Sequence, residues 1–228
     1  MPKRFIVELL WVVSTSVLLP AWAGALQNFG ELEAILGDAI VLEDFEGPNL
    51  FGGSSIAVPN PLNTDTAPAQ WNIEPGATYR SDRNLGLYTG QLLGGASNIL
   101  GGVGALPGED NTVTVQFQLR QAAVGFYLVN ITGNLNYTET VTFYQGATVL
   151  GFMALTLPQA SERFVGWHDP TGITAARVTS DSFALVDNVA WGVSVVPEPS
   201  TSALTLFGAA ALCVLRASRR RALDRVAA

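Results

Sequence analysis

The chain has 228 residues, with 12 basic and 19 acidic side chains, one histidine and one cysteine. A single Cys and a single His exclude a structural zinc site, a disulfide framework and a Cys/His nucleophile pair. Residues 24–195 hold five basic against 16 acidic side chains, a net charge of −11. Because so acidic a body repels phosphate backbones, we expect no nucleic-acid partner.

Residues 1–23 have the pattern of an export signal. Two basic residues precede an apolar run that only Glu8 interrupts, and the small residues Ala21 and Ala23 follow it. This order predicts a secretory signal peptide that signal peptidase cleaves after Ala23. The alternative is an uncleaved anchor, for which the run is shorter than the ~20 residues of a spanning helix.

Residues 24–195 are expected to form an all-β domain. Short β-branched and aromatic runs recur between turn residues, and in residues 112–119 the apolar side chains occupy every second position, as in a half-buried strand. The clearest predicted strands are residues 39–45, 112–119, 122–130, 139–145, 148–155, 163–167, 175–179 and 188–195. Residues 30–37 are predicted to be helical, because their leucines and isoleucine fall on one side of a helix.

We predict that this body is an antiparallel two-sheet sandwich of jelly-roll type. Strands this short, with no alternating helices, bury their inner faces most simply by packing two sheets together. The Gly-rich segment 81–110 is predicted to form tight loops at one end of the sandwich. Phe117, Phe126, Phe143 and Trp191 occupy alternating apolar positions, so we expect them in the core.

Carboxylates at the two ends of this body suggest a cation site. Asp44 and Glu46 belong to the first predicted strand and its end, and Asp187 directly precedes the last. Sandwich domains often place their first and last strands side by side, and calcium takes about six to eight oxygen ligands in irregular geometry. The Phe-Glu-Gly and Asp-Asn-Val sequences also resemble those of galactose-binding-like jelly-roll carbohydrate-binding modules, which implies a structural calcium. The alternative is that all three are solvated charges at strand edges.

Aromatic side chains among polar neighbours are candidates for glycan contact, because sugar rings stack on aromatic faces. Trp71 and Tyr79 lie among polar and turn residues. We therefore expect both to be exposed and available for stacking.

No catalytic site is predicted. The carboxylates stand in no recognisable frame for glycoside hydrolysis. His168 precedes Asp169-Pro170 and is interpreted as a turn residue, since no nucleophile elbow accompanies it. We expect the chain not to be an enzyme.

The carboxyl-terminal segment, residues 196–228, combines three features. Pro197, Glu198 and Pro199 come first, an apolar stretch from residue 203 to 215 follows, and an arginine-rich tail that includes Arg219, Arg220 and Arg221 comes last. The stretch predicts a single transmembrane helix with its basic end in the cytoplasm. About 13 apolar residues make ~20 Å of helix against ~30 Å of hydrocarbon, which suits a temporary anchor.

This arrangement closely resembles the PEP-CTERM sorting signal of Gram-negative bacteria. The resemblance covers residues 196–225 and implies recognition by an exosortase, a membrane cysteine protease that removes the tail near the Pro-Glu-Pro motif. It also implies a precursor held transiently in the inner membrane and a mature protein at the cell surface or outside the cell. We expect from it a structural or adhesive role in exopolysaccharide or biofilm. The alternative is a calcium-stabilised, lectin-like carbohydrate-binding module.

Overall fold

The computed structural model describes residues 23–48, 50, 54–89, 97–103, 111–131 and 136–193. The chain divides into two compact units, Met1–Ser194 and Val195–Ala228, and every described residue belongs to the first. The predicted signal helix with Ala21, the predicted transmembrane helix, and the sorting residues 197–199 and 219–221 all lie outside the described ranges. Within those ranges, no helix is both long enough and apolar enough to cross a membrane.

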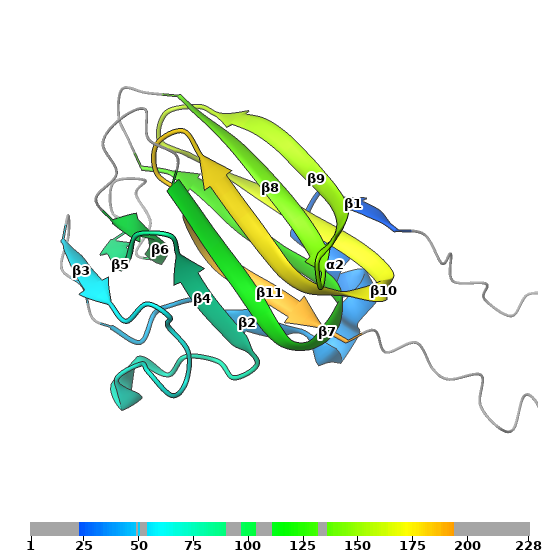
Figure 1. Ribbon diagram of the computed structural model, residues 1–228, viewed down its shortest axis with the longest axis horizontal. Helices are drawn as coiled ribbons and strands as arrows, with labels where there is room; N and C mark the ends of the chain where they lie inside the picture. The colour runs from blue at the N-terminus through cyan, green and yellow to red at the C-terminus, as the bar shows by residue number, and fades with distance from the viewer. Residues whose placement is uncertain are drawn as a thin grey trace, which may run out of the picture. The chain divides into compact units, whose positions relative to one another are not determined.

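The described chain is mostly antiparallel β-structure (Figure 1). Its strands are β1 (Gly24–Leu26), β2 (Val41–Glu43), β3 (Ser55–Val58), β4 (Ala77–Ser81), β5 (Asn84–Thr89), β6 (Asn98–Val103), β7 (Asn111–Asn130), β8 (Tyr137–Gln145), β9 (Thr148–Leu157), β10 (Ser161–Ser180) and β11 (Leu185–Gly192). Among the described residues, the helix α2 (Phe29–Leu36) and the short 3-10 segments η1 (Gly37–Ala39) and η2 (Ala69–Trp71) complete the fold. The all-β prediction and the predicted helix are confirmed.

The helix α2 forms where its sequence caps both ends. The Asn28 side-chain oxygen accepts a hydrogen bond from the Glu31 backbone N–H at 3.0 Å, which satisfies a donor of the first turn. Gly37, with φ of 51°, ends the helix in a conformation that favours glycine. Leu32 and Leu36 are fully buried against the sheet. The helix therefore lies fixed on one face of the sheet, with its first residue at the edge of the site described below.

The strands of the described residues belong to one antiparallel sheet of 11 strands. The order is β3-β5-β6-β11-β7-β10-β8-β9, with β1 on β10, β2 on β11 and β4 on β7. The pairing of β7 with β10 shifts register between His168 and Ile173 and again before Ala175. The separate strands predicted at 112–119 and 122–130 are therefore one strand of 20 residues, and so are those at 163–167 and 175–179.

The sheet bends at these register shifts, so that its two halves face each other across the main core (Figure 1). Phe143 of β8 stacks on Trp167 of β10, with ring centroids 5.7 Å apart, and lies 6.5 Å from Phe126 of β7. Phe117 meets Trp191 at 5.8 Å. The four aromatic residues expected in the core are buried. Two separate sheets are not shown, because hydrogen bonding continues through β7 and β10.

The Gly-rich segment 81–110 is more regular than predicted. Its described residues include β5 and β6, which pair with each other from Asn84 opposite Val103 to Thr89 opposite Asn98. Gly101 lies inside β6, where a β-carbon would come within 2.8 Å of the Ala184 carbonyl oxygen. This glycine therefore permits close packing within a strand. The prediction of loops was wrong here because glycine was interpreted only as a turn residue.

Glu139 places a carboxyl group inside the apolar face of β8. Its side chain is fully buried on the same face as Tyr137 and Val141. Neither carboxyl oxygen has a hydrogen-bond partner in the part of the chain that the structure describes. Burial raises the pKa of Glu139 well above its usual range, and Asp181 raises it further. The ionised form is therefore costly in the folded state.

Replacing Glu139 with methionine, which keeps an unbranched side chain, is expected to stabilise the fold. The free energy of unfolding at pH 8 should rise by about 1–3 kcal/mol, because a buried ionisable group is removed. Urea denaturation of both chains measures this difference. It should be smaller at pH 5, because protonation of the wild-type carboxyl as the pH falls lowers the cost of burying it. A less stable Glu139→Met variant at pH 8 would show that the carboxylate makes a favourable contact.

Candidate functional site

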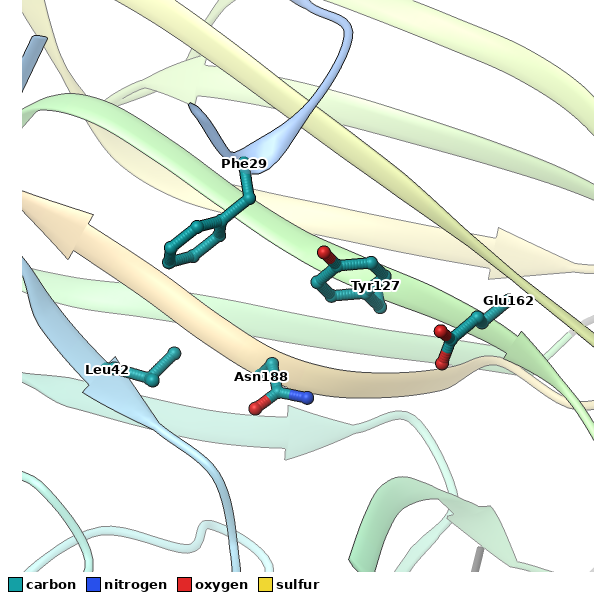
Figure 2. A pocket seen from close by; sticks show the side chains of 5 residues that line it. All are labelled: Phe29, Leu42, Tyr127, Glu162 and Asn188. Carbon is teal, nitrogen blue, oxygen red and sulfur yellow. The ribbon is translucent and has the colours of Figure 1, made fainter. Parts of the chain in front are cut away.

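A pocket of about 360 Å³ lies on the face of the sheet that carries α2 (Figure 2). Its lining comes from five different elements: Phe29 of α2, Leu42 of β2, Tyr127 of β7, Glu162 of β10 and Asn188 of β11. Strand pairing brings these elements together, since β11 lies between β2 and β7, and β10 borders β7 on its other side. The pocket combines aromatic and aliphatic walls with one carboxylate and one amide.

Tyr127 occupies the middle of this pocket (Figure 2). Its chain neighbours Phe126 and Leu128 belong to the main core, so the alternation of a strand turns Tyr127 to the opposite face. There its ring meets Phe164 edge-on at 5.5 Å, and Phe164 in turn meets Phe29 at 6.1 Å. This chain of three rings fixes the orientation of the half-buried tyrosine.

Two carboxylates act on the Tyr127 hydroxyl. Asp187 is its cross-strand partner on β11, and Glu162 lines the pocket from β10. The pKa of Tyr127 is raised by burial first and then by these two acids. The pKa of Asp187 is raised to about 6, chiefly by burial, with smaller contributions from Glu46 and Glu162. The neighbourhood of the pocket is therefore acidic.

The three carboxylates predicted to bind calcium are only partly brought together. The first and last predicted strands were expected to lie side by side, and this is confirmed, since β2 pairs with β11. Glu46 accepts a hydrogen bond from the Asn98 N–H at 2.6 Å, and Asp187 accepts one from the Ser97 hydroxyl at 2.8 Å. Asp44, which is exposed, accepts the Glu46 N–H at 3.1 Å. The described residues contain no group of three or more His, Cys, Asp or Glu side chains that could hold a metal.

Glu43 is a buried carboxylate that the sequence analysis missed. Its two oxygens accept the backbone N–H groups of Phe45 at 2.9 Å and Glu74 at 2.7 Å. Burial outweighs these bonds and raises its pKa to about 7. The available signal was the alternation of β2: once Leu42 faces the pocket, Glu43 must face the core. This carboxylate ties the end of β2 to the chain before β4.

The aromatic residues expected to stack on glycans are placed differently. Tyr79 is fully buried on β4, with its ring 5.2 Å from that of Phe45, so the expectation that it is exposed was wrong. The cause is β4 itself, whose alternate residues Ala77 and Tyr79 face the core. Trp71 is half-buried in η2 and packs against the main core. Its stacking on a glycan stays a prediction.

His168 and Asp169 lie in β10 and not in a turn. His168 pairs with Ala123 of β7 and is buried. The Asp169 carboxylate accepts both the backbone N–H and the hydroxyl of Thr171, at 2.8 and 2.6 Å. The turn interpretation was wrong because β10 continues through the Asp-Pro step at the bend of the sheet.

The three raised carboxyl pKa values predict a fold that is more stable in mild acid. Glu43 and Asp187 shift from ordinary values of 4.5 and 3.8 to about 7 and about 6, and Glu139 shifts in the same direction. At pH values between the ordinary and the raised pKa of each group, the folded state therefore holds more protons than the unfolded chain. The free energy of unfolding should rise by about 1–3 kcal/mol from pH 8 to pH 5. Denaturant titrations at each pH measure it.

The same titrations on a Glu43→Gln variant provide the control. Its unfolding free energy should depend less on pH between 5 and 8, since one of the shifted groups is gone. A wild-type stability that falls over this range on acidification would contradict the assignment of these raised pKa values.

Residues 195–221 match the PEP-CTERM protein-sorting motif. The resemblance of the carboxyl-terminal segment is thereby confirmed, and the chain carries this motif. The motif marks an exported protein with a membrane-anchored precursor that exosortase processes and that is sorted to the cell surface. No curated protein sequence matches the chain.

The similarity of this chain to solved structures is low, as three of them illustrate. The K2 cleaved adhesin domain of Lys-gingipain shares 16% identity over 68% of this chain and 100% of its own, with a TM-score of 0.35. A family 11 carbohydrate-binding module from Clostridium thermocellum, in complex with a β-1,3-1,4-mixed-linked tetrasaccharide, shares 9% sequence identity. The match covers 68% of this chain and 95% of the module, with a TM-score of 0.33. The enzymatically active domain of bacteriophage CBA120 tailspike protein 4 shares 11% sequence identity. The match covers 68% of this chain and 18% of the tailspike chain, with a TM-score of 0.26. Similarities this weak carry no functional argument.

Proposed function

We propose that this chain is the precursor of an exported surface protein with a structural or adhesive role in exopolysaccharide. The sorting motif at residues 195–221 is the observation that carries the proposal. The folded body adds support, because the pocket around Tyr127 has the composition used for sugars, an aromatic face with a few polar groups. Association with polysaccharide needs no more than contacts of this kind, repeated over many copies.

We propose that this role is non-enzymatic. A glycosidase requires two carboxyl groups that face each other across the scissile bond, one of them free to donate a proton. Here the Asp187 carboxyl already accepts hydrogen bonds from the Ser97 hydroxyl at 2.8 Å and the Asn188 N–H at 2.7 Å. These bonds hold the group against the sheet, which supports a structural part for it.

Mass spectrometry of protein from the native cell surface, matrix and medium tests the main proposal. We expect a mature chain that lacks residues 1–23 and ends near residues 197–199, and that leaves the matrix when its polysaccharide is digested. In cells without exosortase, the tail should remain. A mature protein that retains residues 216–228 would contradict processing, and a processed form that never enters the matrix would contradict the adhesive role.

A calcium-stabilised lectin-like module is a second candidate function. The observation that favours it is the proximity of Glu46 and Asp187. The negative charge of Glu46 is close enough to contribute to the raised pKa of Asp187. Both carboxylates already accept hydrogen bonds, so a bound cation would share their oxygens with the chain.

Thermal unfolding with calcium and with chelator separates the two candidates. If the module binds calcium, the melting temperature should rise with calcium concentration by mass action, by several degrees at saturation. Asp187→Asn should abolish the rise, whereas Asp65→Asn, which removes an exposed loop carboxylate, should retain it. An unchanged wild-type melting temperature would leave Asp44, Glu46 and Asp187 as structural charges only.

A further inference from the structure

We infer that the pocket around Tyr127 binds a sugar residue that carries a protonated amine, as in a polysaccharide with free hexosamine units. The inference deepens the proposed association with exopolysaccharide and rests on it for the source of the ligand. It concerns the five lining side chains shown in Figure 2, none of which was predicted from the sequence to contact a sugar.

The size and walls of the pocket suit one sugar ring. A volume of about 360 Å³ lies at the lower end of the range for small-molecule sites. Tyr127 and Phe29 are half-buried and Leu42 is 43% exposed, so apolar surface remains open to a ligand. Because Phe164 fixes the Tyr127 ring, a sugar that stacks on this ring meets a surface that is already oriented.

A bulge in β11 sets the polar side of the pocket. The register between β11 and β7 shifts between Asp187 and Ala190, and Asn188 takes a φ of 49° there. The Asp187 carboxylate accepts the Asn188 N–H at 2.7 Å and supports this conformation. Bulges redirect side chains, and this one lets the Asn188 amide line the pocket together with Glu162 of β10. An amide both donates to and accepts from sugar hydroxyls.

Charge selects the kind of sugar. None of the five lining side chains is basic, and Glu162 has no ion-pair partner within the described part of the chain. The next residue, Arg163, points to the other face because strand residues alternate. Asp187 and Glu46 add negative charge nearby. Such a pocket repels uronic acids and phosphates, whereas an ammonium group gains both a carboxylate partner and the face of Tyr127.

Isothermal titration of the full chain with three tetrasaccharides tests the inference. We expect the glucosamine tetramer to bind about tenfold more tightly than its N-acetylated form and than cellotetraose, which lacks the amine. Raising NaCl from about 50 to 500 mM should weaken the glucosamine tetramer about fivefold. Equal affinity for all three, or binding of none, would overturn the inference.

Variants locate the binding. Glu162→Gln should weaken the glucosamine tetramer at least about fivefold with an unchanged melting temperature, since this side chain is exposed. Asp65→Asn removes the same charge from a loop outside the pocket and should change affinity less than about twofold. Tyr127→Ala should abolish binding, whereas Tyr127→Phe keeps the ring and should retain most of it. A Glu162→Gln chain with wild-type affinity would overturn the inference.

Matrix association separates this inference from the proposed function. If Glu162→Gln and wild type enter the native matrix equally and neither binds the glucosamine tetramer, the pocket inference fails and the adhesive role stands. If the wild type binds the tetramer in solution but never enters the matrix, the pocket inference stands and the adhesive role fails.

Discussion

Two strands of 20 residues, β7 and β10, carry hydrogen bonding from one half of the sheet to the other. Because they bend together at the same register shifts, each half of the sheet covers the other, and the aromatic core closes between them. The same two strands set the candidate site. Tyr127 and Glu162 lie in the halves of β7 and β10 that carry α2, and β11 packs beside them with Asn188. Both core and pocket thus depend on one continuous pair of strands.

The all-β class and the sorting motif could be predicted because both are local patterns. The alternation at residues 112–119 predicts a strand, and the motif is a linear signal. The bend was not visible, since residues 120–121 look like a boundary between strands although the single strand β7 runs through them. Tyr79 was misplaced for a related reason: its polar neighbours concealed a short strand whose alternate residues face the core.

The pocket was beyond sequence reasoning for a physical reason. Tyr127 lies in an apolar run with Phe126 and Leu128, and nothing local distinguishes it from a core residue. Only the pairing of β7 with β10 and β11 brings Glu162 and Asp187 beside it. Glu43 and Glu139 were hidden in the same way, because strand alternation carries an acidic residue inward wherever the register requires it.

The place of β11 in the sheet sets the timing of folding. It is the last described strand of the chain, yet it lies in the interior of the sheet between β6 and β7, with β2 paired to it as well. Until residues 185–192 are in place, the edges of β6 and β7 that β11 joins lack these hydrogen-bond partners. Contacts of such long sequence separation make closure slow. The strand that completes the sheet therefore ends at residue 192, directly before the sorting motif at residues 195–221, so the described part of the body that comes last in the chain is also the part that closes it.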